Sequence, residues 1–374
     1  MTSDKATRPV VLVAIDWYLP AYRAGGPIRS IANLVAALGD EIDFRIVCGN
    51  RDLGESKELQ VKANTWTTFG KSQVQYLPHN DWTAAKWADL LKEVQPNRLY
   101  LNSLYSGPFS RLPWKVARKM GVPTTLAPRG MLGTGALSIK PLRKRAWLQL
   151  QQLTGAYQDI TWHASTEQEK EEIQRWFPRA DIRVALNLPV PFDPLPTPVS
   201  DGTVRLLSVG RVHPIKNYSF AVAIAQRLAT AGHKVQYDIV GPIEDKNEAE
   251  TLRHAAQGIQ LNLLGPTPPA TIRQHYGTAD LVLVPSLNEN YGHAVAESIA
   301  FGRPVVVSNQ TVWSTMQTGP SVACLPLDIS AWTQAAANLL SMDSEDIIRL
   351  SNETYHHCLL DPLHLEAQRT LFAP

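Results

Sequence analysis

Two stretches in the second half of the chain combine residues that can hold a phosphorylated ligand. The first follows a strand-like run, residues 204–209, and contains Gly210, Arg211 and Lys216. A guanidinium offers a planar fork for phosphate oxygens, an ammonium offers a point charge, and glycine lets a ligand approach the backbone. Because ligands of open α/β sheets bind beyond the carboxyl ends of the strands, these residues predict a phosphate site. The alternative is two surface cations before a helix.

The second stretch places two carboxylates around the start of an expected helix. Glu289 precedes Gly292, which permits a tight turn, and Glu297 follows in the helix. A helix N-terminus is a ready anion site, so phosphates would meet the backbone amides of Asn290, Tyr291 and Gly292. Carboxylates are good acceptors for sugar hydroxyls. Alternatively, Glu297 only complements the helix dipole and Glu289 is a solvated loop residue.

Strand-like and helical patterns alternate in both halves of the chain, which predicts an α/β fold with two doubly wound, Rossmann-like domains. We expect the two sheets to face a central cleft that holds the ligand. The expected strands are residues 10–15, 44–48, 98–102, 124–127, 160–163, 204–209, 236–240, 260–263, 281–284, 304–307 and 322–325.

A proline-rich stretch divides the two predicted domains. Residues 189–202 contain prolines at 189, 191, 194, 196 and 198, which bar both a helix and a central strand. We therefore expect an N-terminal domain over 1–188, a linker over 189–202 and a C-terminal domain over 203–357. Residues 358–374 form a tail that we expect to return to the N-terminal domain.

Composition indicates a cytoplasmic protein with two different partners. The chain has 44% apolar and 19% charged residues, three scattered cysteines and no signal-peptide core in residues 1–9. Residues 1–190 hold 25 Lys and Arg against 17 Asp and Glu, whereas residues 191–374 hold 11 against 17. A basic first half favours an anionic substrate or membrane face, and a solvated arginine-rich surface is an equal alternative. We expect no nucleic-acid partner.

Several common phosphate motifs do not occur. No G-x-G-x-x-G follows the first strand, and no G-x-x-x-x-G-K-[ST] is present, which disfavours nicotinamide and P-loop chemistry. No D-x-D triplet occurs to hold a metal against a diphosphate. We therefore expect no metal and no cofactor, with side-chain cations and backbone dipoles neutralising the diphosphate.

The pattern resembles the donor site of the retaining glycosyltransferases of family four, which have the GT-B fold. The likeness covers nearly the whole chain and is most specific in residues 204–309. It rests on GRVHPIKN at 210–217, IVGPIED at 239–245, ADLVLVPS at 279–286, Glu289-x7-Glu297 and AFGRPVVVSN at 300–309. The resemblance implies that Arg211 and Lys216 neutralise the nucleotide diphosphate, that Glu289 contacts the donor sugar and that Glu297 holds the ribose hydroxyls.

The resemblance also implies that the domain over 203–357 binds the nucleotide sugar and that the domain over 1–188 binds the acceptor. The N-terminal half resembles the family more loosely. The resemblance implies that Gly25 and Gly26 place backbone amides near the donor diphosphate, the alternative being a flexible loop before a helix. Arg129 stands where many relatives carry His, so it would meet the sugar or an anionic acceptor. His163 would touch substrate, and a hydrogen-bonded core histidine is an equal alternative.

Residues 140–150 are first basic and then apolar with one aromatic side chain. Such a helix can lie on an anionic membrane face, which would make the protein peripheral on the inner face of the membrane. The alternative, slightly favoured, is a surface helix with one buried side.

The resemblance implies transfer of a hexose or related sugar from a nucleoside diphosphate sugar, most simply UDP- or GDP-sugar, to a hydroxyl of a glycan or lipid-linked acceptor. It implies retention at the anomeric carbon, no metal, and a role in bacterial surface polysaccharide synthesis. The alternatives are another GT-B enzyme, such as a nucleotide-sugar epimerase, and a catalytically silent sugar-nucleotide-binding protein.

Overall fold

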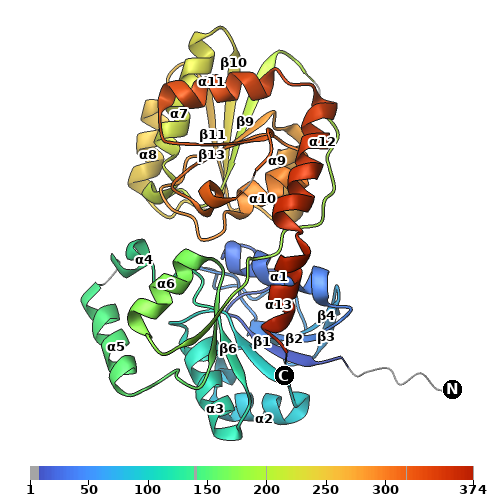
Figure 1. Cartoon of the computed structure of the whole chain (residues 1–374), viewed down its shortest axis with the longest axis vertical. Coiled ribbons are helices and arrows are strands. Elements are labelled where there is room, and N and C mark those ends of the chain that lie inside the picture. Colours follow the sequence, from blue (N-terminus) through green and yellow to red (C-terminus); the bar gives the residue numbers. More distant parts are fainter. Residues whose placement is uncertain (1–7, 139–140, 199, 317, 374) are drawn as a thin grey trace, which may run out of the picture. The chain divides into compact units, whose positions relative to one another are not determined.

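The alternation of strands and helices folds into two sheets, one in each of two units (Figure 1). The computed structural model describes residues 8–138, 141–198, 200–316 and 318–373. Unit 1 comprises Met1–Leu188 and Pro362–Pro374, and unit 2 comprises Pro189–Asp361. The N-terminal residues 1–7 and Lys140, on which two sequence-based expectations partly rest, lie outside the described residues.

Unit 1 contains an eight-stranded sheet in the order β3-β4-β2-β1-β5-β6-β7-β8, with only β3 antiparallel to its neighbour. Its first strand lies in the middle, so the strand order reverses between β1 and β5. The strands are β1 (Val10–Ala14), β2 (Asp43–Gly49), β3 (Thr67–Phe69), β4 (Ser72–Leu77), β5 (Arg98–Leu101), β6 (Thr124–Leu126), β7 (Thr161–Ala164) and β8 (Asp181–Val184).

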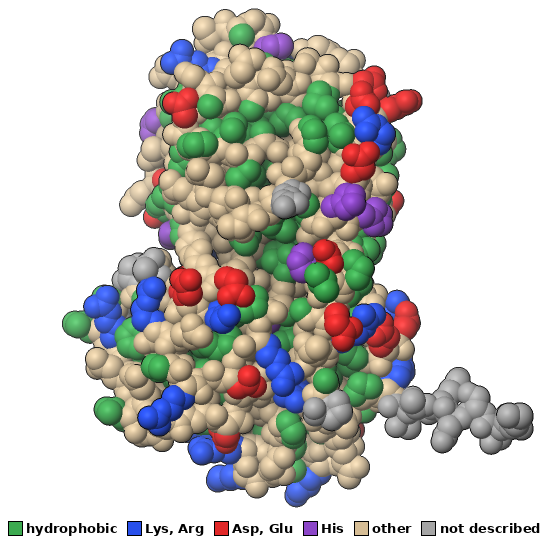
Figure 2. All heavy atoms as spheres, in the orientation of Figure 1, with side chains coloured by type: hydrophobic (Ala, Val, Ile, Leu, Met, Phe, Trp, Pro, Cys, Tyr) green, Lys and Arg blue, Asp and Glu red, His purple; other side chains and the backbone are tan. Residues whose placement is uncertain are grey.

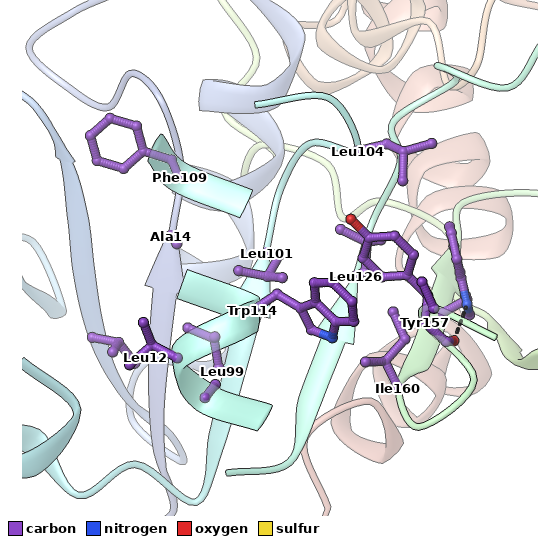
Figure 3. Packing of buried hydrophobic residues seen from close by; sticks show 14 of the residues in the cluster. Leu12, Ala14, Leu99, Leu101, Leu104, Phe109, Trp114, Leu126, Tyr157 and Ile160 are labelled. Carbon is purple, nitrogen blue, oxygen red and sulfur yellow. Dashed lines mark hydrogen bonds between the residues drawn. The ribbon is translucent and has the colours of Figure 1, made fainter. Parts of the chain in front are cut away.

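Helices cover both faces of this sheet, as a doubly wound fold requires. They are α1 (Gly26–Leu38), α2 (Ala84–Val94), α3 (Leu112–Met120), α4 (Thr134–Ser138), α5 (Pro141–Leu153), α6 (Glu167–Trp176) and α13 (Pro362–Thr370), with short turns at His79–Asp81 and Gly107–Arg111. One face packs β1, β5 and β6 against α3, where Trp114 stacks on Tyr157 at 4.1 Å between ring centroids (Figure 3).

Unit 2 contains a six-stranded, fully parallel sheet in the order β11-β10-β9-β12-β13-β14. This is the 3-2-1-4-5-6 order of a Rossmann sheet. The strands are β9 (Thr203–Val209), β10 (Lys234–Val240), β11 (Gln260–Gly265), β12 (Leu281–Val284), β13 (Val305–Ser308) and β14 (Val322–Leu325). The helices are α7 (Tyr218–Thr230), α8 (Lys246–Ala255), α9 (Pro269–Thr278), α10 (His293–Ala300), α11 (Ile329–Leu340) and α12 (Ser344–Thr354), with short turns at Pro214–Lys216, Val312–Thr315 and Tyr355–Leu359.

The proline-rich segment 189–202 is extended and bonded to unit 2 over much of its length, where the sequence suggested a separate linker. Asp193 and Leu195 donate their backbone N–H groups to the carbonyls that end α10, at 2.9 and 3.0 Å. The buried Arg303 guanidinium donates to the carbonyls of Leu195 and Pro196. Prolines bar a ladder here, but their carbonyls remain good acceptors.

The C-terminal residues lie against unit 1. Arg369 of α13 forms an ion pair with Glu41 at 2.7 Å, and Gln368 donates to the Leu186 carbonyl at 2.7 Å. Phe372 is buried and meets Phe44 of β2 edge-on, with 5.9 Å between the ring centroids. The described part of the chain contains no helix long and apolar enough to cross a membrane.

Candidate functional site

The reversal of strand order in unit 2 lies between β9 and β12, and the loops that follow these two strands meet there. The Leu287 N–H donates to the Ile215 carbonyl at 2.9 Å, and the Asn217 side-chain amide donates to the Pro285 carbonyl at 3.2 Å. Such a switch point is where open parallel sheets bind ligands, since adjacent crossovers leave on opposite faces.

Close packing fixes the loop after β9. A Cβ at Gly210 would lie 2.8 Å from the Tyr218 hydroxyl, and one at Gly241 would lie 2.1 Å from the Gly210 carbonyl oxygen. The Tyr218 hydroxyl and the end of the Lys216 side chain therefore lie close to Gly210, and packing alone requires a glycine there. A single turn at Pro214–Lys216, capped by His213 Nδ1 accepting from the Ile215 N–H at 3.2 Å, then directs the Lys216 side chain.

Lys216 and Glu289 form an ion pair across the two loops. Their side chains are only 16% and 14% exposed, so both charges are partly withdrawn from water yet still reachable. Ser286 Oγ also donates to the Glu289 carboxylate, at 2.7 Å. Below them, burial raises the pKa of Tyr218 well above its usual range, so this hydroxyl stays neutral. The structure therefore brings two of the predicted site residues into direct contact.

Arg211 shares the loop with Lys216 but contacts a different carboxylate. Its guanidinium lies 2.8 Å from Glu244, which belongs to the loop after β10, and both side chains are about half exposed, at 50% and 44%. Backbone bonds from Glu244 and Asp245 to the Val212 carbonyl, at 3.2 and 3.0 Å, hold the two loops together. Arg211 is thus a solvated cation beside the switch point, less constrained than Lys216.

Helix α10 begins directly after the loop that contains Glu289. Gly292 adopts the left-handed conformation at φ 76°, and a Cβ there would lie 2.8 Å from Trp313 Nε1, so glycine is required twice over. Trp313 donates to the Tyr291 carbonyl at 2.9 Å, which orients the loop. The same Cβ would lie 3.8 Å from Glu289 Cβ. The Glu289 side chain and the positive end of α10 are therefore neighbours.

The other predicted donor residues differ in exposure. Tyr291 is buried, and its burial raises the pKa of the phenol; within the described residues, no side chain or backbone group bonds its hydroxyl. Asn290 is partly exposed. Glu297 is only 2% exposed, and Tyr276 donates to its carboxylate at 3.2 Å. In this arrangement the Glu297 carboxylate bonds inside unit 2 rather than at its surface.

In unit 1, Gly25 and Gly26 start helix α1. Gly25 has φ 67° and ψ −118°, and a Cβ there would meet nothing within 4 Å, so the glycine serves the turn and lies beside open space. The Asp52 carboxylate fixes the preceding loop, since it accepts from the Tyr22 and Arg23 N–H groups at 3.0 and 3.2 Å. This role of Asp52 could not be predicted from the sequence, because Asp52 lies about thirty residues further along the chain.

His163 belongs to a hydrogen-bonded network inside unit 1. Its Nδ1 lies 2.6 Å from the Tyr100 hydroxyl and its Nε2 lies 2.8 Å from the Ala185 carbonyl oxygen. The ring is 1% exposed, and burial lowers its pKa to about 3, with the Arg129 charge contributing. His163 therefore lies in the environment that the alternative of a hydrogen-bonded core histidine predicted.

Arg129 lies in the same network, at φ 56°. Its guanidinium donates to the side chains of Asn102, Asn187 and Tyr100 at 2.7, 2.6 and 2.9 Å. The Arg129 guanidinium therefore makes these hydrogen bonds inside unit 1. A separate hollow of about 360 Å³ in unit 1, between Gln152 and Ala180, is lined by none of the predicted site residues.

The two Rossmann-like units, each with a parallel sheet, define the GT-B class of fold. Over residues 203–342, which include the β9 and β12 loops, the chain matches the family described as "Glycosyl transferases group 1". A D-inositol 3-phosphate glycosyltransferase of Corynebacterium glutamicum (strain R) is 26% identical over 170 residues, which is 40% of this chain and 38% of that protein. The chain thus spans well under half the length of this curated relative.

Solved structures resemble the whole chain. A sucrose-phosphate synthase from Thermosynechococcus elongatus superimposes with a TM-score of 0.65 at 16% identity, covering 98% of this chain and 95% of the other. A structure described as trehalose-6-phosphate from E. coli, bound with UDP-2-fluoro glucose, gives a TM-score of 0.65 at 12% identity, covering 98% and 99%. At these identities the likeness shows the fold.

Proposed function

We propose that the protein transfers a sugar from a nucleoside diphosphate sugar to an acceptor hydroxyl. The observation that carries this proposal is the ion pair of Lys216 with Glu289 at the switch point of unit 2, beside the N-terminus of α10. A cation, a helix end and a carboxylate together suit a ligand with a diphosphate next to sugar hydroxyls. The match of residues 203–342 to a glycosyltransferase family supports the same conclusion.

Donor binding would exchange the partners of the ion pair. The diphosphate, with more charge than one carboxylate, replaces Glu289 as the counter-ion of Lys216, and Arg211 leaves Glu244 to join it. The released Glu289 then accepts hydrogen bonds from hydroxyls of the donor sugar, as carboxylates do. The amides of Asn290 and Gly292 complete the anion site at the start of α10. Glu297 would accept hydrogen bonds from the ribose hydroxyls after the Tyr276 hydroxyl stops donating to its carboxylate.

In the reaction the bond from the anomeric carbon to the phosphate oxygen breaks and a bond to the acceptor oxygen forms. Negative charge grows on the leaving diphosphate, where Lys216, Arg211 and the α10 dipole stabilise it, often the largest catalytic contribution. The acceptor proton passes to the leaving phosphate oxygen, so no protein base and no metal are needed. Retention at the anomeric carbon is part of this proposal and is based on the family resemblance.

The proposed donor is a UDP- or GDP-sugar, and the proposed acceptor is a glycan or lipid-linked hydroxyl of a bacterial surface polysaccharide. A UDP donor is supported by the UDP-2-fluoro glucose bound to one structure of the same fold. An acceptor that carries phosphate is the competing choice, since the curated relative is named for inositol 3-phosphate.

A thermal-shift screen of UDP-, GDP-, ADP- and dTDP-sugars tests the donor class, because a ligand that binds only the folded protein raises its unfolding temperature. We expect one nucleotide family to stabilise the protein and the others to leave it unchanged. The stabilising donor is then incubated with and without acceptor glycans. Conversion of donor without acceptor would indicate an epimerase, binding without any turnover would indicate a silent binding protein, and no stabilisation by any donor would refute the proposal.

A further inference from the structure

Helix α5 of unit 1 has an unusually exposed outer side. Among its residues only Leu148 is buried, and Leu142, Leu150 and Leu153 are 83%, 54% and 85% exposed. Among the described residues, no other large hydrophobic side chain is as exposed as Leu142 and Leu153. Single exposed leucines are ordinary, but two nearly bare ones on the same helix require an explanation.

The exposed apolar residues form one stripe. Leu142, Ala146, Leu150 and Leu153 are spaced i, i+4, i+8 and i+11, so at about 100° per residue they fall within an arc of about 80°. Leu148 lies on the opposite side. We call these four residues the outer stripe of α5. All four are exposed, Leu142 and Leu153 almost fully, so the helix has two apolar sides and only one of them is buried.

The inner side is firmly attached to unit 1. Trp147 meets Tyr105 edge-on, with 5.4 Å between ring centroids, and lies 6.3 Å from the Tyr157 ring. Lys144 donates to the Ala136 carbonyl and lies over the Tyr105 ring at 5.3 Å. These contacts hold α5 on unit 1 through its inner side. The outer stripe takes no part in them and faces solvent.

The charged residues of α5 itself are all positive. Arg143 and Arg145 lie on either side of the outer stripe and are exposed. Residues 94–158 contain ten Lys and Arg and no Asp or Glu, although the whole chain has nearly equal numbers of both. Figure 2 shows Lys, Arg and hydrophobic side chains together at the edge of unit 1 where Figure 1 labels α5.

We propose that the outer stripe of α5 docks the protein on an anionic lipid surface. A helix that lies in a membrane interface needs an apolar stripe about one helix face wide and cations on its flanks, which is the pattern found here. The leucines enter the acyl boundary while Arg143 and Arg145 remain at the level of the lipid phosphates. The two alternatives for residues 140–150 are then compatible: α5 has one side buried in unit 1 and another side that contacts the membrane.

The proposal does not depend on the function assigned to unit 2. The outer stripe lies on α5 of unit 1, and none of its residues or flanking arginines belongs to the β9 or β12 loops. Loss of docking and loss of donor binding are therefore separate outcomes.

Flotation of the full-length protein with vesicles tests the docking. Vesicles of phosphatidylcholine alone are compared with vesicles that also contain phosphatidylglycerol. We expect binding to the anionic vesicles only, weakened by salt. The variant L142S/L153S should lower the bound fraction about tenfold, since two exposed leucines no longer enter the lipid. R143Q/R145Q should also bind less, with a smaller salt dependence.

Leu363 provides a matched control, because it is a 74% exposed leucine on α13 of the same unit. L363S should float like the wild type, and both leucine variants should unfold at the wild-type temperature. Equal flotation of L142S/L153S and the wild type would overturn the proposal. Two further results would also overturn it. If the wild type forms a dimer without lipid and L142S/L153S does not, a second copy of the chain occupies the outer stripe. If only R143Q/R145Q loses binding, the arginines bind a soluble polyanion.

Discussion

The two units share the strand order of a Rossmann sheet at their centres, although unit 1 adds β3 and β8 at its edges (Figure 1). The comparison of their switch points shows how the same position in a fold can have two different roles. In unit 1 the loops after β1 and β5 are joined by Ser106, whose hydroxyl donates to Asp16 at 2.6 Å. In unit 2 the loops after β9 and β12 are joined by the ion pair of Lys216 with Glu289. Topology decides where loops meet, and side-chain charge decides what they do there.

The chemical contrast follows from burial. Burial raises the pKa of Asp16, and the joint in unit 1 consists of this carboxyl and a hydroxyl. The joint in unit 2 contains a full cation beside a helix N-terminus, and each partner keeps some exposure. A joint of the first kind stabilises a fold, whereas a joint of the second kind can exchange its partner for a ligand.

Replacing Lys216 by alanine should have the largest effect, because it removes the cation that distinguishes the switch point of unit 2 from that of unit 1. It removes the cation that we expect to meet the diphosphate and leaves Glu289 next to the incoming anion. Affinity for the stabilising donor should fall about a hundredfold or more, by calorimetric titration. Lys234→Ala is the matched control, because this exposed lysine lies at the amino-terminal end of β10, whereas the site lies beyond the carboxyl ends of the strands. A similar loss in both variants would mean that general charge, not the switch point, attracts the donor.

Replacing Glu289 by glutamine tests the exchange of partners. The amide removes the internal counter-ion of Lys216, so binding of the nucleoside diphosphate product should tighten about threefold to tenfold. Turnover should fall about tenfold or more, because the donor sugar loses a charged acceptor. Asp193→Asn, which removes the ion pair with Arg273, is the control and should change neither quantity. Weaker product binding in Glu289→Gln would show that the carboxylate positions Lys216 rather than competes for it.

The sequence predicted the parts of the fold whose signals are local. Strand β12 occupies the residues that the apolar run 281–284 indicated, and β9 extends the expected run by one residue. Strand β4 was missed because Ser72 and Gln75 interrupt its apolar pattern, although both side chains are buried. Buried polar residues inside a strand cannot be recognised from alternation alone.

The candidate site divides in the same way. The proximity of Lys216 and Glu289 follows from the order of strands, which the sequence could suggest through its βαβ pattern. The pairing of Arg211 with Glu244 depends on the loop after β10, and the contact of Tyr276 with Glu297 depends on how α9 packs. Such contacts join residues far apart in the chain, and no spacing rule encodes them.

The variant His163→Gln should show that the hydrogen-bonded network of His163, Tyr100 and Arg129 in unit 1 is structural. Burial lowers the pKa of His163 to about 3, below its ordinary 6.5, so between these pH values the unfolded chain binds the additional proton. This contribution to stability is therefore complete above about pH 6.5 and is lost as the pH falls toward 3. His163→Gln should cost about 1–3 kcal/mol at pH 7 and show a shallower decline toward pH 5 than the wild type, measured by urea unfolding.

Donor affinity gives the second reading on that variant. Because His163 has both ring nitrogens bonded within unit 1, we expect His163→Gln to bind the donor as the wild type does. A weaker affinity with an unchanged stability would reverse the assignment and make His163 a substrate contact.

The smallest expected effect comes from Gly25→Ala at the start of α1. The combination of φ 67° and ψ −118° suits glycine, and the added methyl meets open space, so the cost should be strain alone, about 1–3 kcal/mol. Gly70→Ala is the control, since Gly70 has φ 56° and equal room in another turn of unit 1. If the loop before α1 meets the donor diphosphate, KM for the donor should rise about threefold to tenfold in Gly25→Ala only. If both variants lose stability and neither changes KM, unit 2 alone binds the donor, and the contrast between the two switch points becomes complete.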